Sequence, residues 1–146
     1  MEPRSGQFTK GNHGDNKIIF RIADVYLMAA EAENELNGPT ALAYQWINQV
    51  RERAYEPDMP LSGLTKEDFR QAIYDERRWE LGGEGHRRMD LIRWGMLEEV
   101  VKNTAYRVWD PAANIQPHHV LLPIPTEEFV LNPALLDSDP SNNEYR

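Results

Sequence analysis

The sequence predicts an all-α fold, an αα-superhelix of tetratricopeptide-like helix hairpins followed by an irregular, proline-rich C-terminal segment. Three observations predict it. Apolar residues recur at helical spacing from residue 22 to about residue 100. Glycines and prolines divide that stretch at the places where helices end and begin. After residue 103, prolines recur every few residues, which excludes long helices there.

The composition bounds the class of protein. A chain of 146 residues suits one compact domain, so we expect a flexible segment over residues 1–17 and a single helical domain over residues 18–146. The net charge of −8 argues against a nucleic-acid partner, which would need clustered Lys and Arg. The chain has no Cys, which excludes disulfides, thiolate zinc sites and cysteine nucleophiles. No apolar run reaches the length needed to cross a bilayer, and residues 1–17 lack the pattern of a signal peptide.

The first two predicted helices form an antiparallel hairpin over residues 21–55. Each carries an apolar stripe at steps of three and four residues, the spacing of one helix face. Gly38 ends the first helix, and Pro39 can open the second because a first-turn N–H has no helical partner. Pro57 and Pro60 stop the second helix. The stripes are Ile22, Val25, Tyr26, Ala29, Ala32 and Leu36, then Ala43, Trp46, Ile47, Val50 and Ala54.

A second hairpin is predicted over residues 66–101. Thr65 followed by Asp68 resembles a capping box, with Asp in place of Glu or Gln, and two adjacent glycines end this third helix. Its apolar stripe consists of Phe69, Ala72, Ile73 and Trp79. A fourth helix is expected over residues 86–102, with a kink at Gly95.

The C-terminal segment is predicted to be mostly irregular. Residues 120–125 (VLLPIP) should be extended, because the residue before each proline is driven toward β or polyproline geometry. Thr126 can cap a short helix that runs through Leu131, and Asn132 with Pro133 ends it. The last residues are expected to form an exposed tail.

Four sequence blocks carry a resemblance to a known family. They are RIADVYLMAAEAENELNG, INQVRERA, ERRWELGGEGHRRMDLIRWG and LLPIPTEEFVLNP, and together they cover most of residues 21–133. In order and spacing they resemble the C-terminal region of the SusD/RagB family of nutrient-binding outer-membrane lipoproteins. The resemblance implies the tetratricopeptide-like αα-superhelix predicted above.

The resemblance also implies a function. Family members look like surface-exposed lipoproteins of the cell outer membrane that capture glycans or peptides and pass them to a TonB-dependent transporter. This chain is therefore expected to be a non-catalytic part of a glycan- or nutrient-binding protein, with no cofactor. The alternative is a general helical-repeat module for protein–protein interaction, because a helix hairpin alone does not fix function.

The chain is much shorter than family members, and it lacks the lipid-bearing Cys. We therefore expect a fragment, a truncated gene product or a shortened version of a longer protein. The resemblance implies that the glycan site lies mostly outside this chain, which should bind glycans weakly or not at all alone. Loss of part of a superhelix should also expose apolar surface and favour self-association.

Two carboxylates, Glu76 and Glu80, lie at the centre of the apolar arc of the third helix. One interpretation is a general acid and base pair for glycoside cleavage. The favoured interpretation is a structural pairing with arginine, because an unpaired buried charge is very costly. Arg93 of the fourth helix is the first candidate partner, and Arg87 and Arg88 are the alternatives.

The remaining candidates are histidines and loop aromatics. His86 with Asp90, and the adjacent His118 and His119, could ligate a metal, but nothing joins the two pairs into a full ligand set. A helix start for His86 and an exposed loop for the others explain them better. The candidate ligand-binding residues are Trp109 and Tyr106, since loop aromatics can stack on sugar rings. The favoured interpretation of Trp109 itself is that it packs against the helical core from outside, as large aromatic residues commonly do.

Overall fold

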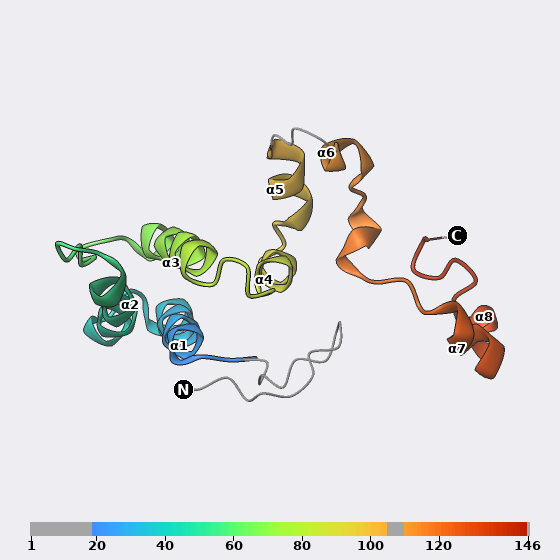
Figure 1. The fold of residues 1–146 in the computed structure, drawn as a ribbon, viewed down its shortest axis with the longest axis horizontal. Coiled ribbons are helices and arrows are strands. Elements are labelled where there is room, and N and C mark those ends of the chain that lie inside the picture. The colour runs from blue at the N-terminus through green and yellow to red at the C-terminus, as the bar shows by residue number, and fades with distance from the viewer. Residues whose placement is uncertain (1–18, 105–109, 146) are drawn as a thin grey trace, which may run out of the picture. The chain divides into compact units, whose positions relative to one another are not determined.

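The computed structural model describes residues 19–104 and 110–145 (Figure 1). Every regular element within these two ranges is a helix, so the all-α prediction is confirmed. None of the described helices is long and apolar enough to cross a bilayer.

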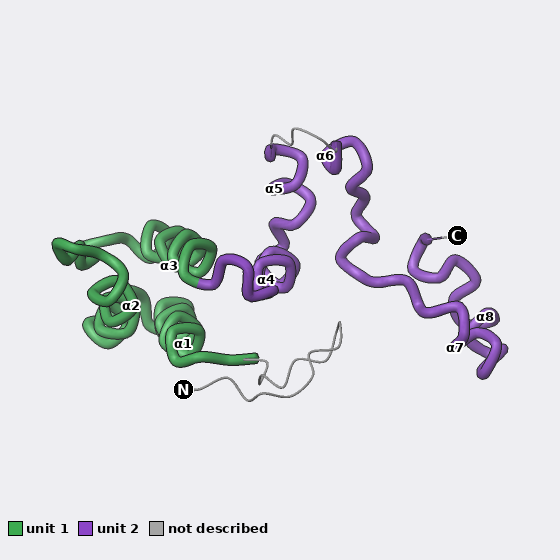
Figure 2. The backbone as a smooth tube through the Cα atoms, viewed as in Figure 1, with its two compact units in different colours: residues 1–80 green, residues 81–146 purple. Residues whose placement is uncertain are grey.

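The chain divides into two compact units, residues 1–80 and residues 81–146 (Figure 2). The expectation of one helical domain over residues 18–146 stays a prediction, and each unit is described by itself. The first unit contains α1 (Ile22–Asn37), α2 (Ala41–Ala54) and α3 (Lys66–Glu80). The second contains α4 (Arg87–Arg93), α5 (Leu97–Asn103), α6 (Pro111–Asn114), the 3₁₀ helix η1 (Pro117–Val120), α7 (Thr126–Leu131) and α8 (Ala134–Ser138).

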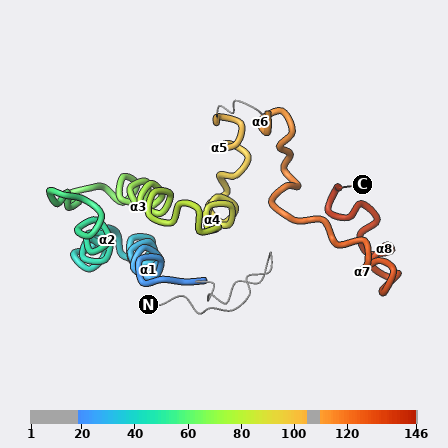
Figure 3. The backbone as a smooth tube through the Cα atoms, viewed as in Figure 1, coloured from blue at the N-terminus to red at the C-terminus, as the bar shows by residue number. Residues whose placement is uncertain are grey.

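Helices α1 and α2 form the predicted antiparallel hairpin and are labelled on the tube in Figure 3. Gly38 ends α1 with a φ of +83°, a left-handed conformation that glycine adopts without steric cost. The prediction that Pro39 opens α2 is wrong. Thr40 is the N-cap instead, and its hydroxyl oxygen accepts a hydrogen bond from the Ala43 N–H at 3.3 Å.

The core of the first unit lies where α1 packs against both α2 and α3. The apolar stripes predicted for α2 and α3 supply Ile47, Val50, Phe69 and Ile73, all buried. Most of the stripe predicted for α1 does not face this core, although Tyr26 packs against it. The buried residues of α1 are Ala23, Asp24, Leu27, Ala30 and Asn34.

Part of the apolar stripe predicted for α1 lies on the solvent side, because the helix carries small and apolar residues on two faces. Ile22, Val25 and Leu36 are exposed, and Leu36 reaches 80%. Apolar surface of this kind is what a packing partner would cover. The self-association expected from the sequence stays a prediction that this surface supports.

Helix α3 begins at the predicted cap. The Thr65 hydroxyl oxygen accepts from the Asp68 N–H at 3.1 Å, and the hydroxyl donates to the Asp68 carboxylate at 2.8 Å. The second bond replaces the reciprocal side chain–backbone bond of a full capping box. A turn over residues 81–85 follows α3, and Gly83 and Gly85 take φ values of +82° and +88° in it.

The prediction of one helix over residues 86–102 is wrong. Two short helices, α4 and α5, replace it, so the second hairpin over residues 66–101 does not form as a pair of continuous helices. Gly95 separates them with a φ of +70°, which a right-handed helix cannot contain. The Met96 N–H then bonds to the Leu91 carbonyl at 2.8 Å.

The C-terminal segment contains short helices only, as predicted. Residues 121–125 are not helical, whereas Val120 belongs to η1. Thr126 is the first residue of α7 and caps nothing, because Pro125 occupies the N-cap position. Asn132 ends α7 as expected, but α8 was not predicted.

The last described residues are mostly exposed, as predicted, but side-chain bonds attach them to residues 121–124. Asn142 is buried, and its side chain bonds both the N–H of Ile124 at 2.7 Å and the carbonyl of Ile124 at 3.2 Å. Asn143 donates to the Leu122 carbonyl, and the Tyr145 hydroxyl donates to the Leu121 carbonyl at 3.0 Å. Asparagine tolerates the positive φ that both positions require.

Candidate functional site

Two buried arginine–carboxylate pairs join the helices of the first unit. The carboxylate of Asp24 on α1 accepts from the Arg77 guanidinium on α3 at 2.8 Å, and both side chains are almost fully buried. The carboxylate of Glu76 accepts from Arg51 of α2 at 2.5 Å. Together the two pairs connect α3 to both helices of the hairpin.

Burial determines how Glu76 titrates. Its side chain is 2% exposed, and loss of hydration raises the pKa of this carboxyl above the usual 4.5, while the bond from Arg51 acts in the opposite direction. Arg51 is itself fixed by a bond from its Nε to the Met59 carbonyl at 2.8 Å, and its guanidinium lies over the Tyr55 ring. The pair is therefore a rigid, desolvated contact.

Glu80 also pairs with arginine, but not with the expected one. Its side chain accepts hydrogen bonds from Arg21 and Arg53. The prediction that Glu76 and Glu80 pair with Arg93, Arg87 or Arg88 is wrong. Arg93 pairs with Asp90 three residues earlier, at 2.9 Å.

The arginine partners that sequence reasoning missed lie in the first 53 residues. The signal was present in the block INQVRERA, where Arg51 shares a helix face with Ile47 and Val50. A charged residue on an apolar face requires a partner of opposite charge, and this holds for Arg51 as it does for Glu76 and Glu80. The prediction that the glutamates pair with arginine is therefore correct. The choice of arginines close to them in the sequence is wrong.

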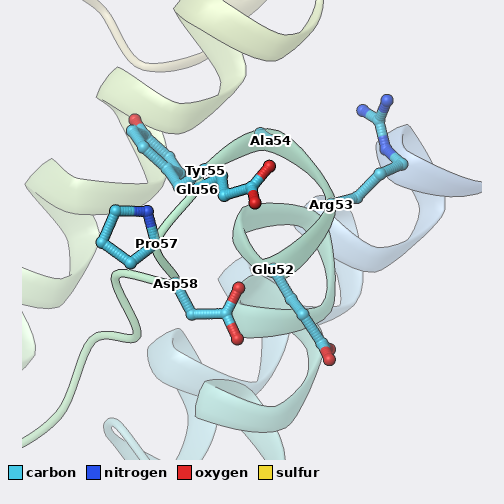
Figure 4. Close-up of a pocket in the computed structure, with 7 residues that line it drawn as sticks. All are labelled: Glu52, Arg53, Ala54, Tyr55, Glu56, Pro57 and Asp58. Atoms are coloured by element: carbon cyan, nitrogen blue, oxygen red, sulfur yellow. The ribbon is translucent and has the colours of Figure 1, made fainter.

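A hollow of about 510 Å³ lies at the end of α2, where three exposed carboxylates gather (Figure 4). Figure 4 shows the Arg53 side chain extending away from these carboxylates, consistent with its pairing with Glu80. The three acids are Glu52, Glu56 and Asp58. Within the described parts of the chain, no cluster of three His, Cys, Asp or Glu side chains could hold a metal ion.

A second hollow, of about 360 Å³, lies within the second unit, and we call it the α5–α6 hollow. Its apolar walls come from α5 and α6, and polar side chains from α4, η1 and the C-terminus complete it. It is lined by Arg88, Leu97, Val101, Pro111, Asn114, Ile115, His119 and Tyr145.

The two adjacent histidines belong to an aromatic cluster and not to an exposed loop. They lie in η1, their ring centroids are 4.3 Å apart, and both contact the Tyr145 ring. His118 Nδ1 lies 3.4 Å from a Glu144 carboxylate oxygen, and the backbone N–H of Gln116 donates to His119 Nδ1 at 2.7 Å. His86 directly precedes α4, as expected.

The candidate ligand-binding residues Tyr106 and Trp109 lie outside the described residues. The structure therefore brings neither of them to a site, and both stay predictions. The α5–α6 hollow was not found from the sequence, because its lining residues are spread over residues 88–145 with no repeating spacing.

Comparison with known proteins identifies the family. The sequence model of the SusD family matches residues 3–142. A SusD-like protein of Formosa agariphila is 62% identical over 137 residues, which are 92% of this chain and 26% of the relative. A second one from the same organism is 33% identical over 141 residues, covering 89% of this chain and 27% of the relative.

A solved structure agrees with the sequence matches. The crystal structure of a SusD homolog from Bacteroides thetaiotaomicron superposes with a TM-score of 0.67 at 39% identity. The superposition covers 77% of this chain and 24% of that chain. The fold is thus the helical fold of a SusD-type protein, and this chain belongs to the SusD family. It spans about a quarter of the length of the relatives that it matches.

Proposed function

We propose that this chain is the non-catalytic binding and scaffold part of a cell-surface glycan- or nutrient-binding protein. It works with a TonB-dependent transporter in the outer membrane. The observation that carries the proposal is the SusD family match over residues 3–142. A helical unit held by buried ion pairs supports a scaffold role, because such pairs fix the relative placement of packed helices.

The arrangement of acids in the first unit favours binding over catalysis. A glycosidase needs two carboxyl groups that flank an open cleft. Glu76 is instead buried against Arg51, and Glu80 is held by Arg21 and Arg53. Both acids are accounted for by helix packing, so no step of a hydrolytic reaction is assigned to them.

Tyr106 and Trp109 remain the proposed ligand contacts of this chain. Because the chain spans about a quarter of its relatives, we expect the purified chain to bind glycans weakly or not at all. Isothermal titration against a panel of glycans tests this expectation. Low-micromolar binding to one glycan, lost in Trp109→Ala, would overturn it and make Trp109 a principal site residue.

The partner is tested in the cell that makes the protein. The protein is tagged, outer membranes are isolated under mild detergent, and co-purifying proteins are identified by mass spectrometry against an untagged strain. We expect a TonB-dependent transporter to be the main enriched partner. Enrichment of a different protein from a fraction without outer membrane would contradict the proposal and favour a general helical-repeat interaction module.

A further inference from the structure

The α5–α6 hollow has the size and walls of a small ligand site. Its volume of about 360 Å³ falls at the lower end of the range of roughly 300–1,000 Å³ typical of such sites. Leu97 and Val101 of α5, together with Pro111 and Ile115, supply its apolar lining. An apolar lining suits a ring better than a charged chain, because a ring presents a C–H or π face.

The charged group of the hollow is a positioned arginine. The Arg88 Nη2 donates to the His119 carbonyl at 2.7 Å, which orients the guanidinium. Guanidinium carries five N–H donors, so this bond leaves further donors for a ligand. A planar guanidinium matches a carboxylate in two parallel hydrogen bonds.

His119 supplies a second donor. Its Nδ1 accepts from the Gln116 N–H, so the neutral ring carries its proton on Nε2. The ring contacts His118 and Tyr145, which restricts its rotation. Arg88 and His119 thus both contribute N–H donors to the lining of the hollow.

The described lining contains one cation and no carboxylate, in a chain whose net charge is −8. An anionic ligand therefore gains an attraction in this hollow that most of the surface does not offer. A cationic ligand meets Arg88 and is repelled.

We propose that the α5–α6 hollow binds a six-membered ring that bears a carboxylate, with the ring against the apolar lining and the carboxylate on Arg88 and His119. The proposal rests on the proposed function only in that a nutrient-binding protein needs ligand sites. Two sources offer this chemistry, an acidic sugar and an aromatic acid, and the experiment separates them.

The test is a nuclear magnetic resonance titration of the whole ¹⁵N-labelled chain with four probes: glucuronate, benzoate, glucose and benzamide. The last two are the neutral counterparts of the first two. We expect one or both carboxylates to shift the amide signals of Val101, Ile115 and His119. The dissociation constant should be about millimolar, given the few atoms of each probe. Glucose and benzamide should bind at least about tenfold more weakly.

Two variants locate the interaction. Arg88→Gln should weaken carboxylate binding by about tenfold or more, because it removes a charge-assisted contact. Lys102→Gln removes an exposed charge of the same sign from α5, outside the hollow, and should leave binding unchanged. Val101→Phe fills the hollow and should abolish binding, and its amide spectrum reports whether the fold is kept.

Binding of glucuronate alone would assign the site to an acidic sugar, and binding of benzoate alone to an aromatic acid. The proposal is overturned if neither carboxylate shifts these amides, if the neutral probes bind equally well, or if Arg88→Gln binds as tightly as the parent. Transporter co-purification does not depend on Arg88, so we expect the Arg88→Gln protein still to co-purify. The two experiments thereby distinguish a failure of the ligand-site proposal from a failure of the proposed function.

Discussion

The two units of the chain are built in different ways. In the first unit, three helices of 14 to 16 residues surround a shared apolar core and are joined by buried ion pairs. In the second unit, the helices have 4 to 7 residues. Helices that short are marginal by themselves, so side-chain bonds to the backbone, such as those of Asn142 to Ile124, hold this unit together.

The two units also differ in the roles of their charged and aromatic residues, which are structural in the first unit and proposed ligand contacts in the second. The two residues that look catalytic in the sequence are Glu76 and Glu80. Both belong to the first unit, where their carboxylates form ion pairs with arginines. The proposed ligand contacts, Arg88 and His119, belong to the unit with little core, and Tyr106 and Trp109 lie in the same part of the chain. Binding residues commonly lie on irregular segments that a stable scaffold supports.

The largest effect is expected from the Asp24–Arg77 pair. Arg77→Met leaves a buried carboxylate without its partner and should lower the free energy of unfolding by about 3–5 kcal/mol. Arg78 is its neighbour on α3 and is exposed, so Arg78→Met should change stability by no more than about 0.5 kcal/mol. Urea unfolding followed by circular dichroism measures both. Equal stabilities for the two variants would show that the first unit does not depend on its buried pairs.

The Arg51–Glu76 pair should give a measurable coupling. The double variant of Arg51→Met with Glu76→Gln should be more stable than the sum of the two single changes predicts, by about 1–3 kcal/mol. Arg93→Met is the matched control, because Arg93 pairs with Asp90. Glu76→Gln combined with Arg93→Met should be additive. Coupling to Arg93 and additivity with Arg51 would contradict the pairing described here.

In the second unit, the bonds of Asn142 and Asn143 should matter in place of buried ion pairs. Asn142 and Asn143 take φ values of 50° and 55°, so replacement by alanine strains the backbone equally at both. Asn142→Ala removes two part-buried bonds to Ile124, whereas Asn143→Ala removes one exposed bond to the Leu122 carbonyl. Asn142→Ala should therefore loosen the C-terminus by about 1–3 kcal/mol more than Asn143→Ala. Limited proteolysis of the C-terminus reports this. Identical cleavage rates in both variants would argue against Asn142 as the main attachment.

Two glutamates of the first unit should respond to pH in opposite directions. Burial raises the pKa of Glu76, so folding favours its protonated form. The stability of the parent relative to Glu76→Gln should therefore fall as the pH rises from 4.5 through the raised value. The bond from Arg70 lowers the pKa of the exposed Glu35. The parent's advantage over Glu35→Gln should be present above pH 4.5 and lost as the pH falls. Parallel urea unfolding across acidic pH compares them, and slopes of the same sign would refute the assignment.

The sequence predicted the long helices well, because local signals determine them. Gly38, Thr65 and the apolar spacing of α2 and α3 are readable without knowledge of the partner helices. The buried face of α1 was not readable, because Ala23, Leu27 and Ala30 compete with Ile22, Val25 and Leu36, and only packing selects between two apolar faces.

The second unit was less predictable for a related reason. Gly95 was identified as a kink, but its positive φ, which divides the helix, is a tertiary outcome. The α5–α6 hollow assembles from residues of five separate stretches, and no spacing in the sequence marks them as neighbours. The prediction of the ion-pair partners of Glu76 and Glu80 was wrong for the same reason, because Arg51 lies 25 residues from Glu76.

Hydrogen exchange of the whole chain, followed by mass spectrometry, tests most directly the claim that the chain combines a stable scaffold unit with a less stable contact unit. Amides in α1, α2 and α3 should exchange slowly and as one set, because they share a core. Amides in α4 to α8 should exchange faster, and Arg51→Met should accelerate the first set, because it removes the pair that joins α2 to α3. Equal protection in both units, or unchanged exchange of the first set in Arg51→Met, would contradict the account.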